Sequence, residues 1–478
     1  MNVPIRRVAI VAMIMFLALL INVTQISVFQ APGLNAHPMN RRARDAEFAQ
    51  DRGPIIAGGE PIAESVKVDS RFAFQRTYPN GPLYAPVTGY FSYDHASVGL
   101  EAAYTEELAG TASSLFVRRM VDLVTGRKPK GASVETTIVP GAQRVAAERL
   151  GNRKGAVVAI DPDTGAVLAM VTHPSYDPNA IAGHDIATAD ENYRKLADDP
   201  GRPMANRATR EIYPPGSVFK LVTAAAALEN GMEPNTQVES PASLTLPNTN
   251  TQLGNSTNCG GSKVTIDKAL QTSCNTAFAN IGLDLGADAL REQAIKFGFG
   301  KEPLPDLDAV ASRFPDDMDG AQLAMSSIGQ YEVATSPLQM AMVTAGIAND
   351  GVVMEPYVVN TVRAPNLTPL YTHQPREMPR AMTTDNARKL QDMMVNVVES
   401  GTGTNARLSG VRVGGKTGTA QSAPERPPYA WFVAFGEVDG RKVAVAVFVE
   451  EADIPRNDIA GGRLAAPIAR AVIQELLQ

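Results

Sequence analysis

Residues 206–231 read NRATREIYPPGSVFKLVTAAAALENG, and this stretch decides the fold. Pro214 and Pro215 end the incoming segment in an extended conformation, because proline fixes φ and restricts the residue before it. From Gly216 onward no residue interrupts a helix until Gly231, a common C-terminal stop. The residues between these glycines are apolar on every face, which predicts a buried helix.

The first turn of this expected helix carries Ser217 and Lys220, three positions apart and therefore on one face. Burial lowers the pKa of a lysine, so a neutral amine could take the serine proton, and the pair could act as nucleophile and base. A lone Ser-x-x-Lys pattern also fits a helix-capping serine beside a lysine that extends to solvent. Two further motifs decide between these interpretations.

The first is Ser273-Cys274-Asn275, which lies in a break between helical stretches. In an extended tripeptide alternate side chains share a side, so Ser273 and Asn275 are expected to point one way and Cys274 the other.

The second is Lys416-Thr417-Gly418-Thr419, which continues a strand-like run. Gly418 is expected to let an acyl substrate approach the backbone closely. Lys416 supplies positive charge for a substrate carboxylate, with the hydroxyls of Thr417 and Thr419 beside it.

The ordered set Ser-x-x-Lys, Ser-x-Asn, Lys-Thr-Gly is the signature of penicillin-binding proteins and related β-lactamases. Nearly the whole chain resembles a class B penicillin-binding protein. Further stretches that carry this resemblance are Asn40-Arg41, Arg52-Gly53-Pro54-Ile55, Arg76-Thr77-Tyr78-Pro79, Val87-Thr88-Gly89-Tyr90, Gly99-Leu100-Glu101, Ile328-Gly329-Gln330, Thr335-Ser336-Pro337-Leu338-Gln339, Ala348-Asn349-Asp350-Gly351 and Gly401-Thr402-Gly403-Thr404.

The resemblance implies a peptidoglycan D,D-transpeptidase that cross-links stem peptides through a serine acyl-enzyme and is inhibited by β-lactams. It implies these roles: Ser217 as nucleophile, Lys220 as its base, Ser273 as proton relay, Asn275 as holder of the acyl chain's amide, Lys416 and Thr417 as carboxylate ligands, and the backbone amides of Ser217 and Thr419 as oxyanion hole. It also implies a partner, a SEDS-type membrane glycan polymerase.

Two alternatives are open at this point. A D,D-carboxypeptidase or β-lactamase would use water to resolve the acyl-enzyme, and a β-lactam sensor would use acylation as a signal. The apolar N-terminus argues against a secreted lactamase, and the lack of a cytoplasmic domain argues against a sensor.

The N-terminus predicts a membrane anchor. Arg6 and Arg7 precede an apolar run from Val8 to Ile21, which extends less regularly to Phe29. No small-x-small cleavage site follows, so an uncleaved anchor with the arginines inside and the rest of the chain outside is favoured over a cleaved signal peptide. The net charge of −6 and 20% charged residues show no basic tract, which argues against nucleic-acid binding.

The expected architecture is α+β, with an antiparallel sheet shared by strands from both ends of the last domain and helices between them. The expected domains are an anchor at 1–30, a stalk and small β-containing interaction module at 31–135, and a penicillin-binding transpeptidase domain at 136–478. Residues 31–60 are expected to form an extended stalk. The predicted strands are 72–78, 85–93, 155–160, 165–172, 411–415, 431–438 and 442–450, and the predicted helices are 266–285, 289–297, 322–349, 381–398 and 465–477, with a long surface loop at 232–263.

The chain has two cysteines, Cys259 and Cys274. An even count and an outer-side location favour a disulfide over two free thiols, and such a bridge would order the wall of the site. No cofactor or metal is expected, because His37, His95, His173, His184 and His373 are scattered without ligand spacing.

Overall fold

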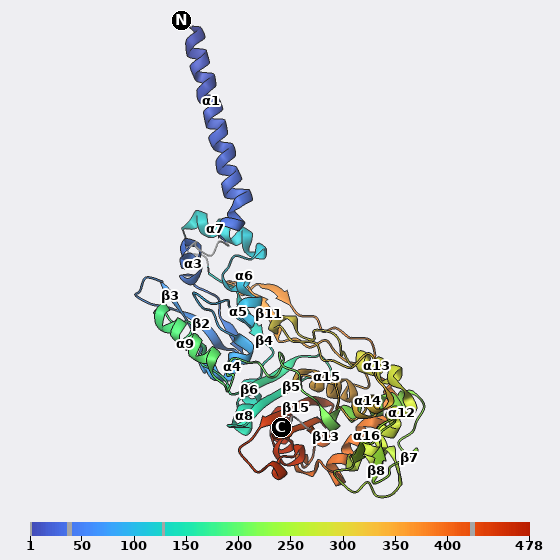
Figure 1. Cartoon of the computed structure of the whole chain (residues 1–478). Coiled ribbons are helices and arrows are strands. Elements are labelled where there is room, and N and C mark those ends of the chain that lie inside the picture. Colours follow the sequence, from blue (N-terminus) through green and yellow to red (C-terminus); the bar gives the residue numbers. More distant parts are fainter. Residues whose placement is uncertain (1, 36–40, 127–129, 421–425) are drawn as a thin grey trace.

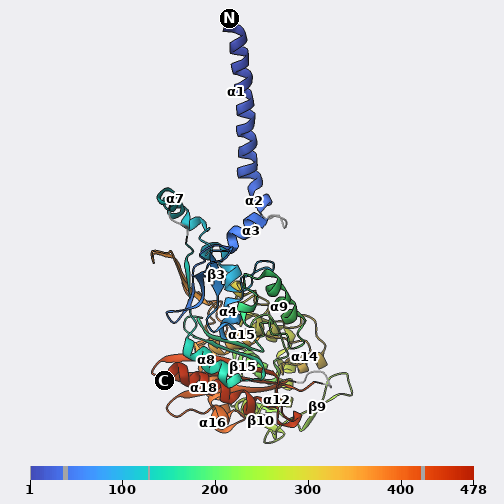
Figure 2. The same ribbon diagram turned by 90° about the vertical axis from the view of Figure 1, so that its left-hand side faces the viewer.

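The computed structural model describes residues 2–35, 41–126, 130–420 and 426–478. A long helix, α1 (Asn2–Thr24), projects from one end of the molecule (Figure 1). A smaller N-terminal module follows α1, and a larger C-terminal body forms the opposite end of the molecule (Figure 2).

The helix α1 continues through a π-helical turn, Gln25–Gln30, into α2 (Ala31–Asn35). Residues Val3–Gln30 form an apolar helix none of whose side chains is buried, and it is the single span of this kind in the described residues. A bilayer core needs about 20 apolar residues in a helix, so this segment is long enough to cross one.

The N-terminal module is built on a six-stranded sheet with the order β12-β11-β4-β1-β2-β3. Two of these strands come from residues 359–372, so a segment far along the chain completes the sheet. The strands are β1 (Ile55–Ala57), β2 (Glu60–Lys67), β3 (Phe74–Thr77), β4 (Ser133–Thr136), β11 (Val359–Arg363) and β12 (Pro369–Thr372). The helices are α3 (Arg41–Phe48), α4 (Gly81–Thr88), α5 (Leu100–Ala103), α6 (Thr105–Leu108) and α7 (Phe116–Thr125).

Two predictions for this region are wrong. Residues 31–60 do not form an extended stalk, because α3 ends in Phe48, which packs on Phe72 and Phe91 at centroid distances of 5.0 and 5.4 Å. Residues 85–93 do not form a strand. Pro82 lies in the first turn of α4, where its missing N–H costs nothing, and Gly89 ends this helix at φ +66°.

A buried ion cluster holds the module together. Glu101 is fully buried and accepts hydrogen bonds from Arg52 at 2.9 Å and Arg76 at 2.6 Å. Tyr78 donates to the same carboxylate at 3.1 Å. Burial would raise the pKa of Glu101, but the guanidinium groups of Arg76 and Arg52 outweigh it and hold that pKa below its usual value.

The C-terminal body is organised around a five-stranded antiparallel sheet with the order β13-β14-β15-β5-β6. The strands are β5 (Lys154–Ile160), β6 (Val167–His173), β13 (Arg412–Ala420), β14 (Tyr429–Val438) and β15 (Arg441–Glu451). β15 pairs with both β14 and β5, which confirms that strands from both ends of this part of the chain share one sheet. Alternate residues face opposite cores: Val158 lies in the core beneath α15, and Val157 in the core beneath α8 and α18.

Helices cover both faces of this sheet (Figure 1). α8 (Pro140–Leu150) and α18 (Ala466–Leu477) pack on one face, and α15 (Pro337–Ala348) packs on the other. The other helices of the body are α10 (Lys220–Glu229), α11 (Ile266–Thr272), α12 (Asn275–Leu285), α13 (Ala287–Lys296), α14 (Gly320–Ser326), α16 (Thr384–Ser400) and α17 (Gly461–Leu464). α9 (Ile186–Asp198) packs on the N-terminal module, where its Tyr193 contacts Tyr90 (Figure 1). The predicted surface loop at 232–263 contains two small hairpins, formed by β7 (Gln237–Glu239) with β10 (Lys263–Thr265) and by β8 (Ser243–Thr245) with β9 (Gln252–Gly254).

Two predicted helices are each broken in two. The 266–285 helix breaks at Ser273, whose left-handed conformation (φ +60°) ends α11. The 322–349 helix breaks at Gly329 (φ +73°), and Ser336 then caps α15 by accepting the backbone N–H of Gln339. Ser273 at the first break and Gln330 at the second line the same cleft as Ser217.

We predict that Glu101→Gln lowers the free energy of unfolding by about 3–5 kcal/mol, because two guanidinium groups would lose their buried partner. The lowered pKa of Glu101 means that this stabilisation is present above pH ~4.3, its usual unfolded value, and is lost as pH falls through the folded value. Urea denaturation of the full chain in detergent, at pH 7 and at acid pH, measures the difference.

The matched control is Glu191→Gln, which removes an exposed i,i+4 partner of Lys195 and should change little. A loss at Glu101 no larger than at Glu191, or one that persists undiminished at acid pH, would contradict the prediction.

Candidate active site

Ser217 lies on a tight 3₁₀ turn, Gly216–Phe219, that runs directly into α10. Gly216 adopts φ +55° and donates its N–H to the Gly329 carbonyl at 2.9 Å. A Cβ on Gly329 would lie 2.2 Å from the Gly216 carbonyl oxygen, so glycine is required there for the loop to support the turn. The first residues of the expected helix, Gly216–Phe219, therefore form a separate 3₁₀ turn that is supported by Gly329.

The turn is also pressed onto strand β13. A Cβ on Gly418 would lie 3.0 Å from Val218 Cγ1 and 3.1 Å from the Pro215 carbonyl oxygen. Trp431 Nε1 donates to the Pro214 carbonyl at 3.1 Å. The absent side chain of Gly418 thus makes room for the turn that carries Ser217, and the approach of an acyl substrate to the backbone at this glycine stays a prediction.

Lys220 is fully buried at the first position of α10. Its Nζ donates to the Ser273 carbonyl at 2.8 Å and to Asn275 Oδ1 at 2.7 Å, and it lies 3.3 Å from Ser273 Oγ. The alternative of a lysine that extends to solvent is excluded by this burial.

Lys416 is also fully buried and approaches the same hydroxyl from β13. Its Nζ donates to Ser273 Oγ at 2.8 Å and to the Thr417 carbonyl at 3.0 Å. Ser273 Oγ therefore lies between two lysine nitrogens. The expected extended tripeptide is wrong: Ser273 is left-handed, and Asn275 is the first residue of α12, yet both side chains reach Lys220.

Burial lowers the pKa of both lysines. Desolvation brings the pKa of Lys416 to about 7. Desolvation, followed by the nearby charge of Lys416, lowers the pKa of Lys220 well below its usual value. A neutral amine at Lys220 is therefore accessible near neutral pH.

Ser217 opens onto a cleft of about 940 Å³. Lys416 and Gly418 are not among the residues that line it. The lining includes Ser217, Asn255, Ser273, Asn275, Gln330, Thr402, Thr417, Thr419, Gly461, Gly462 and Arg463. Thr402 and Thr417 share a hydrogen bond between their hydroxyls at 2.6 Å. No carboxylate side chain lines the cleft among these described residues, so it suits an anionic substrate.

Asn255 is a site residue that the sequence interpretation missed. Its Oδ1 accepts the backbone N–H groups of Asn275 at 2.7 Å and Thr276 at 3.0 Å, at the start of α12. Its Nδ2 donates to the Pro241 carbonyl at 3.1 Å. Asn255 therefore fastens the cleft loop to the Ser-x-Asn motif. The sequence feature that could have indicated Asn255 is its position four residues before Cys259, in the loop that the predicted disulfide joins to the Ser-x-Asn motif.

The bridge between Cys259 and Cys274 is present, which confirms the predicted disulfide. It joins the same loop to the middle of the Ser-x-Asn motif, beside the Asn255 hydrogen bonds. The loop is thus attached to α12 both covalently and by side-chain hydrogen bonds.

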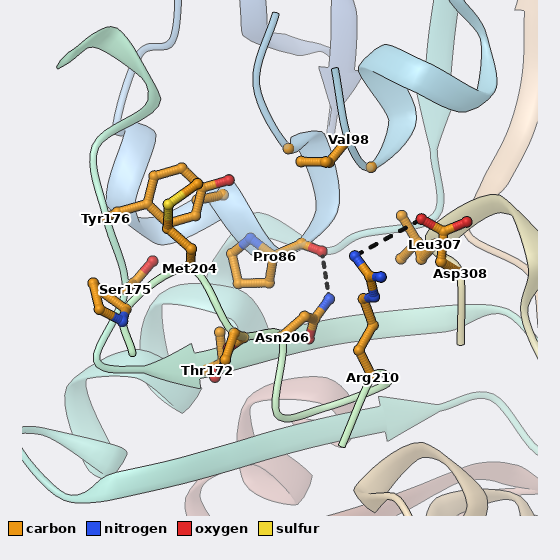
Figure 3. Close-up of a pocket in the computed structure, with 15 residues that line it drawn as sticks. Pro86, Val98, Thr172, Ser175, Tyr176, Met204, Asn206, Arg210, Leu307 and Asp308 are labelled. Carbon is orange, nitrogen blue, oxygen red and sulfur yellow. Dashed lines mark hydrogen bonds and ion pairs between the residues drawn. The ribbon is translucent and has the colours of Figure 1, made fainter. Parts of the chain in front are cut away.

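A second, much smaller cavity of about 40 Å³ lies where the N-terminal module meets the body (Figure 3). Asn206 Nδ2 donates to the Pro86 carbonyl at 2.9 Å across it, and Arg210 lies 3.9 Å from Asp308. Its volume is too small for a peptide, so this cavity marks a packed junction at the segment that leads to Ser217.

The described residues contain no group of three or more His, Cys, Asp or Glu side chains that could hold a metal ion. His37 and Asn40 lie outside the described residues. His95 stacks on Tyr193 and His373 on Tyr357, at centroid distances of 3.6 and 3.7 Å, which are packing arrangements.

Comparison with protein-family models shows which family the chain matches. Residues 155–474 match the family model described as the penicillin binding protein transpeptidase domain, which covers more than half of the chain. The chain belongs to the penicillin-binding protein transpeptidase family. Residues 52–134 match the penicillin binding protein A dimerisation domain.

Relatives of this family member are similar along its whole length. The peptidoglycan D,D-transpeptidase PbpA of Mycolicibacterium smegmatis is 44% identical over 100% of this chain and 99% of that protein. PbpA of Mycobacterium tuberculosis is 42% identical over the same shares. The ceftriaxone acyl-enzyme complex of penicillin-binding protein A from M. tuberculosis has a TM-score of 0.87 at 41% identity, covering 91% of this chain and 100% of that one. These relatives agree with the expected resemblance to class B penicillin-binding proteins, and within them to actinobacterial penicillin-binding protein A.

We predict that Asn255→Ala speeds amide hydrogen exchange at Asn275 and Thr276 by at least about fivefold, the loss of roughly one hydrogen bond's worth of stability (~1 kcal/mol). Reduction of the disulfide should speed exchange mainly in the loop around Cys259. The measurement is exchange mass spectrometry on peptides that separate residues 253–262 from 273–278.

The control is Asn258→Ala, a change in the same loop at a residue whose side chain bonds the backbone of Gly260 instead. Equal exchange at Asn275 and Thr276 in the two variants would show that Asn255 does not secure the motif.

Proposed function

We propose that this protein is a peptidoglycan D,D-transpeptidase that works through an acyl-enzyme on Ser217 and is acylated by β-lactams. The observation that carries the proposal is the buried Lys220 amine, bonded to Ser273 and Asn275 one helical turn from Ser217. The names of the M. smegmatis and M. tuberculosis relatives support the same reaction.

In the first half-reaction Ser217 Oγ attacks the carbonyl carbon of the penultimate D-Ala of a stem peptide. Neutral Lys220 takes the hydroxyl proton, and the amide C–N bond to the terminal D-Ala breaks. Ser273 Oγ, between Lys220 and Lys416, relays a proton to the leaving amine. The backbone N–H groups of Ser217 and Thr419 stabilise the oxyanion.

In the second half-reaction the amine of another stem peptide attacks the ester carbonyl. The same relay runs in reverse: the attacking amine loses its proton to the Lys220–Ser273 pair, and Ser217 Oγ regains one as it leaves. The product is a peptide cross-link, and no cofactor or metal takes part.

The substrate carboxylate is held by the hydroxyls of Thr417 and Thr419, two residues that line the cleft. Lys416 acts from behind these residues, because its Nζ is buried against Ser273 Oγ. Asn275 Nδ2 donates to the Gly254 carbonyl at 3.0 Å, and its second hydrogen lets it hold a carbonyl of the acyl chain.

Val3–Gln30 anchors the chain in the cell membrane. Arg6 and Arg7 lie at its cytoplasmic end, and the residues after Gln30 lie on the outer side. The division into anchor (1–30), module (31–135) and transpeptidase domain (136–478) is part of this proposal. A SEDS-type glycan polymerase in the same membrane is its partner and supplies the glycan strands. The disulfide supports an extracytoplasmic location, where such bridges persist.

We predict a single covalent penicillin adduct on wild-type protein, absent in Ser217→Ala. Intact-mass spectrometry after incubation with penicillin measures it. A Ser256→Ala variant, in which another serine of the same cleft is changed, should label like the wild type. Retained labelling in Ser217→Ala would disprove the assignment of the nucleophile.

Incubation with a stem pentapeptide and an acceptor amine then separates transpeptidation from hydrolysis, because only transpeptidation gives a cross-linked product.

We predict that acylation accelerates as pH rises through the lowered pKa of Lys220 and levels off well below pH 10.4, the usual lysine value. Lys416→Gln removes a neighbouring positive charge, so the pKa of Lys220 should rise and the accelerating limb should move to higher pH. Lys220→Arg should not acylate, because a guanidinium does not lose its proton. Stopped-flow acylation across pH measures all three, and an unmoved limb in Lys416→Gln would refute the coupling of the two lysines.

A further inference from the structure

Helix α7 (Phe116–Thr125) carries large apolar side chains that are about half or more exposed. Phe116, Met120 and Val124 follow one another at intervals of four residues and so share one side of the helix. Their exposed fractions are 57%, 46% and 83%, and the adjacent Val121 is 55% exposed. The helix is held mainly through the preceding 3₁₀ turn, Ser113–Leu115, where Leu115 is buried.

The position of α7 relative to the end of α1 indicates which surface its apolar face contacts. In both views α7 lies at about the height of the lower end of α1, to one side of it in Figure 2, and in Figure 1 it runs across the direction of α1. An apolar helix that crosses a bilayer ends at the membrane–water boundary, so α7 lies at the level of that boundary. A helix in this plane with large apolar side chains on one face has the features of an interfacial helix.

The basic residues around α7 indicate that this surface is negatively charged. Exposed Arg41 and Arg42 begin α3, which lies just below the end of α1 in both views, and exposed Lys130 follows α7 in the sequence. The sequence of residues 116–130 contains five basic residues and one acid. This local excess contrasts with the net charge of −6 for the whole chain, and it suits anionic lipid headgroups.

We propose that α7 is a second membrane contact, with Phe116, Met120, Val121 and Val124 inserted at the outer boundary of a bilayer that contains anionic lipid. The contact holds the module at a fixed height and tilt, which α1 alone does not do, because a single helix can rotate and tilt. This inference rests on the proposal that α1 spans the membrane, and the experiment below separates the two.

The test uses the full chain in vesicles of phosphatidylcholine and phosphatidylglycerol. Both natural cysteines are in the disulfide, so a single introduced cysteine carries the only free thiol and accepts an environment-sensitive NBD fluorophore. NBD at Val124→Cys should emit at shorter wavelength than in water, and lipids with a nitroxide at a shallow acyl position should quench it. The matched control is Ile295→Cys on α13, an apolar helical residue that is 52% exposed and far from α1, which should show neither effect.

NBD at Phe16→Cys in α1 reports the anchor separately and should be quenched by a nitroxide placed deep in the acyl chains. Quenching at Phe16 with a water-like, unquenched Val124 signal would overturn the α7 contact and leave the anchor intact. Quenching at Val124 without quenching at Phe16 would support the contact and overturn the anchor. A short-wavelength Val124 signal that lipid nitroxides do not quench, and that fades as protein is diluted in lipid, would show that a second copy covers this face and would also overturn the proposal.

Discussion

Two buried lysine nitrogens face one serine hydroxyl, and the arrangement of the whole body serves this contact. Lys220 and Lys416 lie 3.3 and 2.8 Å from Ser273 Oγ, and both are fully buried. Two adjacent ammonium charges in the interior would repel strongly, so the site is stable because each lysine pKa is lowered and the Ser273 carbonyl and Asn275 Oδ1 accept hydrogen bonds. Desolvation, and after it the charge of Lys416, lowers the pKa of Lys220 and so prepares a neutral amine one helical turn from Ser217. The desolvation that makes a buried lysine unfavourable is thus what allows Lys220 to act as a base.

That contact requires three elements from distant parts of the chain to meet closely. α10 supplies Lys220, β13 supplies Lys416, and the break between α11 and α12 supplies Ser273. Glycines make the approach feasible, because a side chain at Gly329 would collide with the turn that carries Ser217, and one at Gly418 would press on Trp431 and on this turn. On the opposite wall the Cys259–Cys274 bridge and Asn255 hold the break in place. The site is therefore fixed from both sides before substrate arrives, as catalysis by positioned groups requires.

The sequence was informative where local pattern determines structure. The three motifs, the buried helix, the shared sheet of the body and the disulfide were all predictable, because spacing, periodicity and compartment carry those signals. Long-range pairing carried no such signal. Nothing near Val359 indicated that β11 would join the N-terminal sheet, and nothing in residues 31–60 indicated that Arg52 would be buried against Glu101. The α4 helix was hidden because Pro86 lies inside it and β-formers surround it. The direction of Gly418 could not be known without the turn that packs on it.

The pairing of β11 with β4 has a mechanical consequence for the cleft. β11 and β12 belong to the body in sequence and to the module in space, so a hinge between the two parts would have to break strand hydrogen bonds. Tyr104 of the module also donates to Asp306 of the body at 2.9 Å, and Asn206 bonds the module on the segment that leads to Ser217. The body's strand β13 and helix α12, which frame the cleft, lie at the end of the molecule away from α1 (Figure 1). A module joined so firmly to the body acts as a rigid spacer, and the distance of Ser217 from α3, at the near end of the module, is then set by the fold.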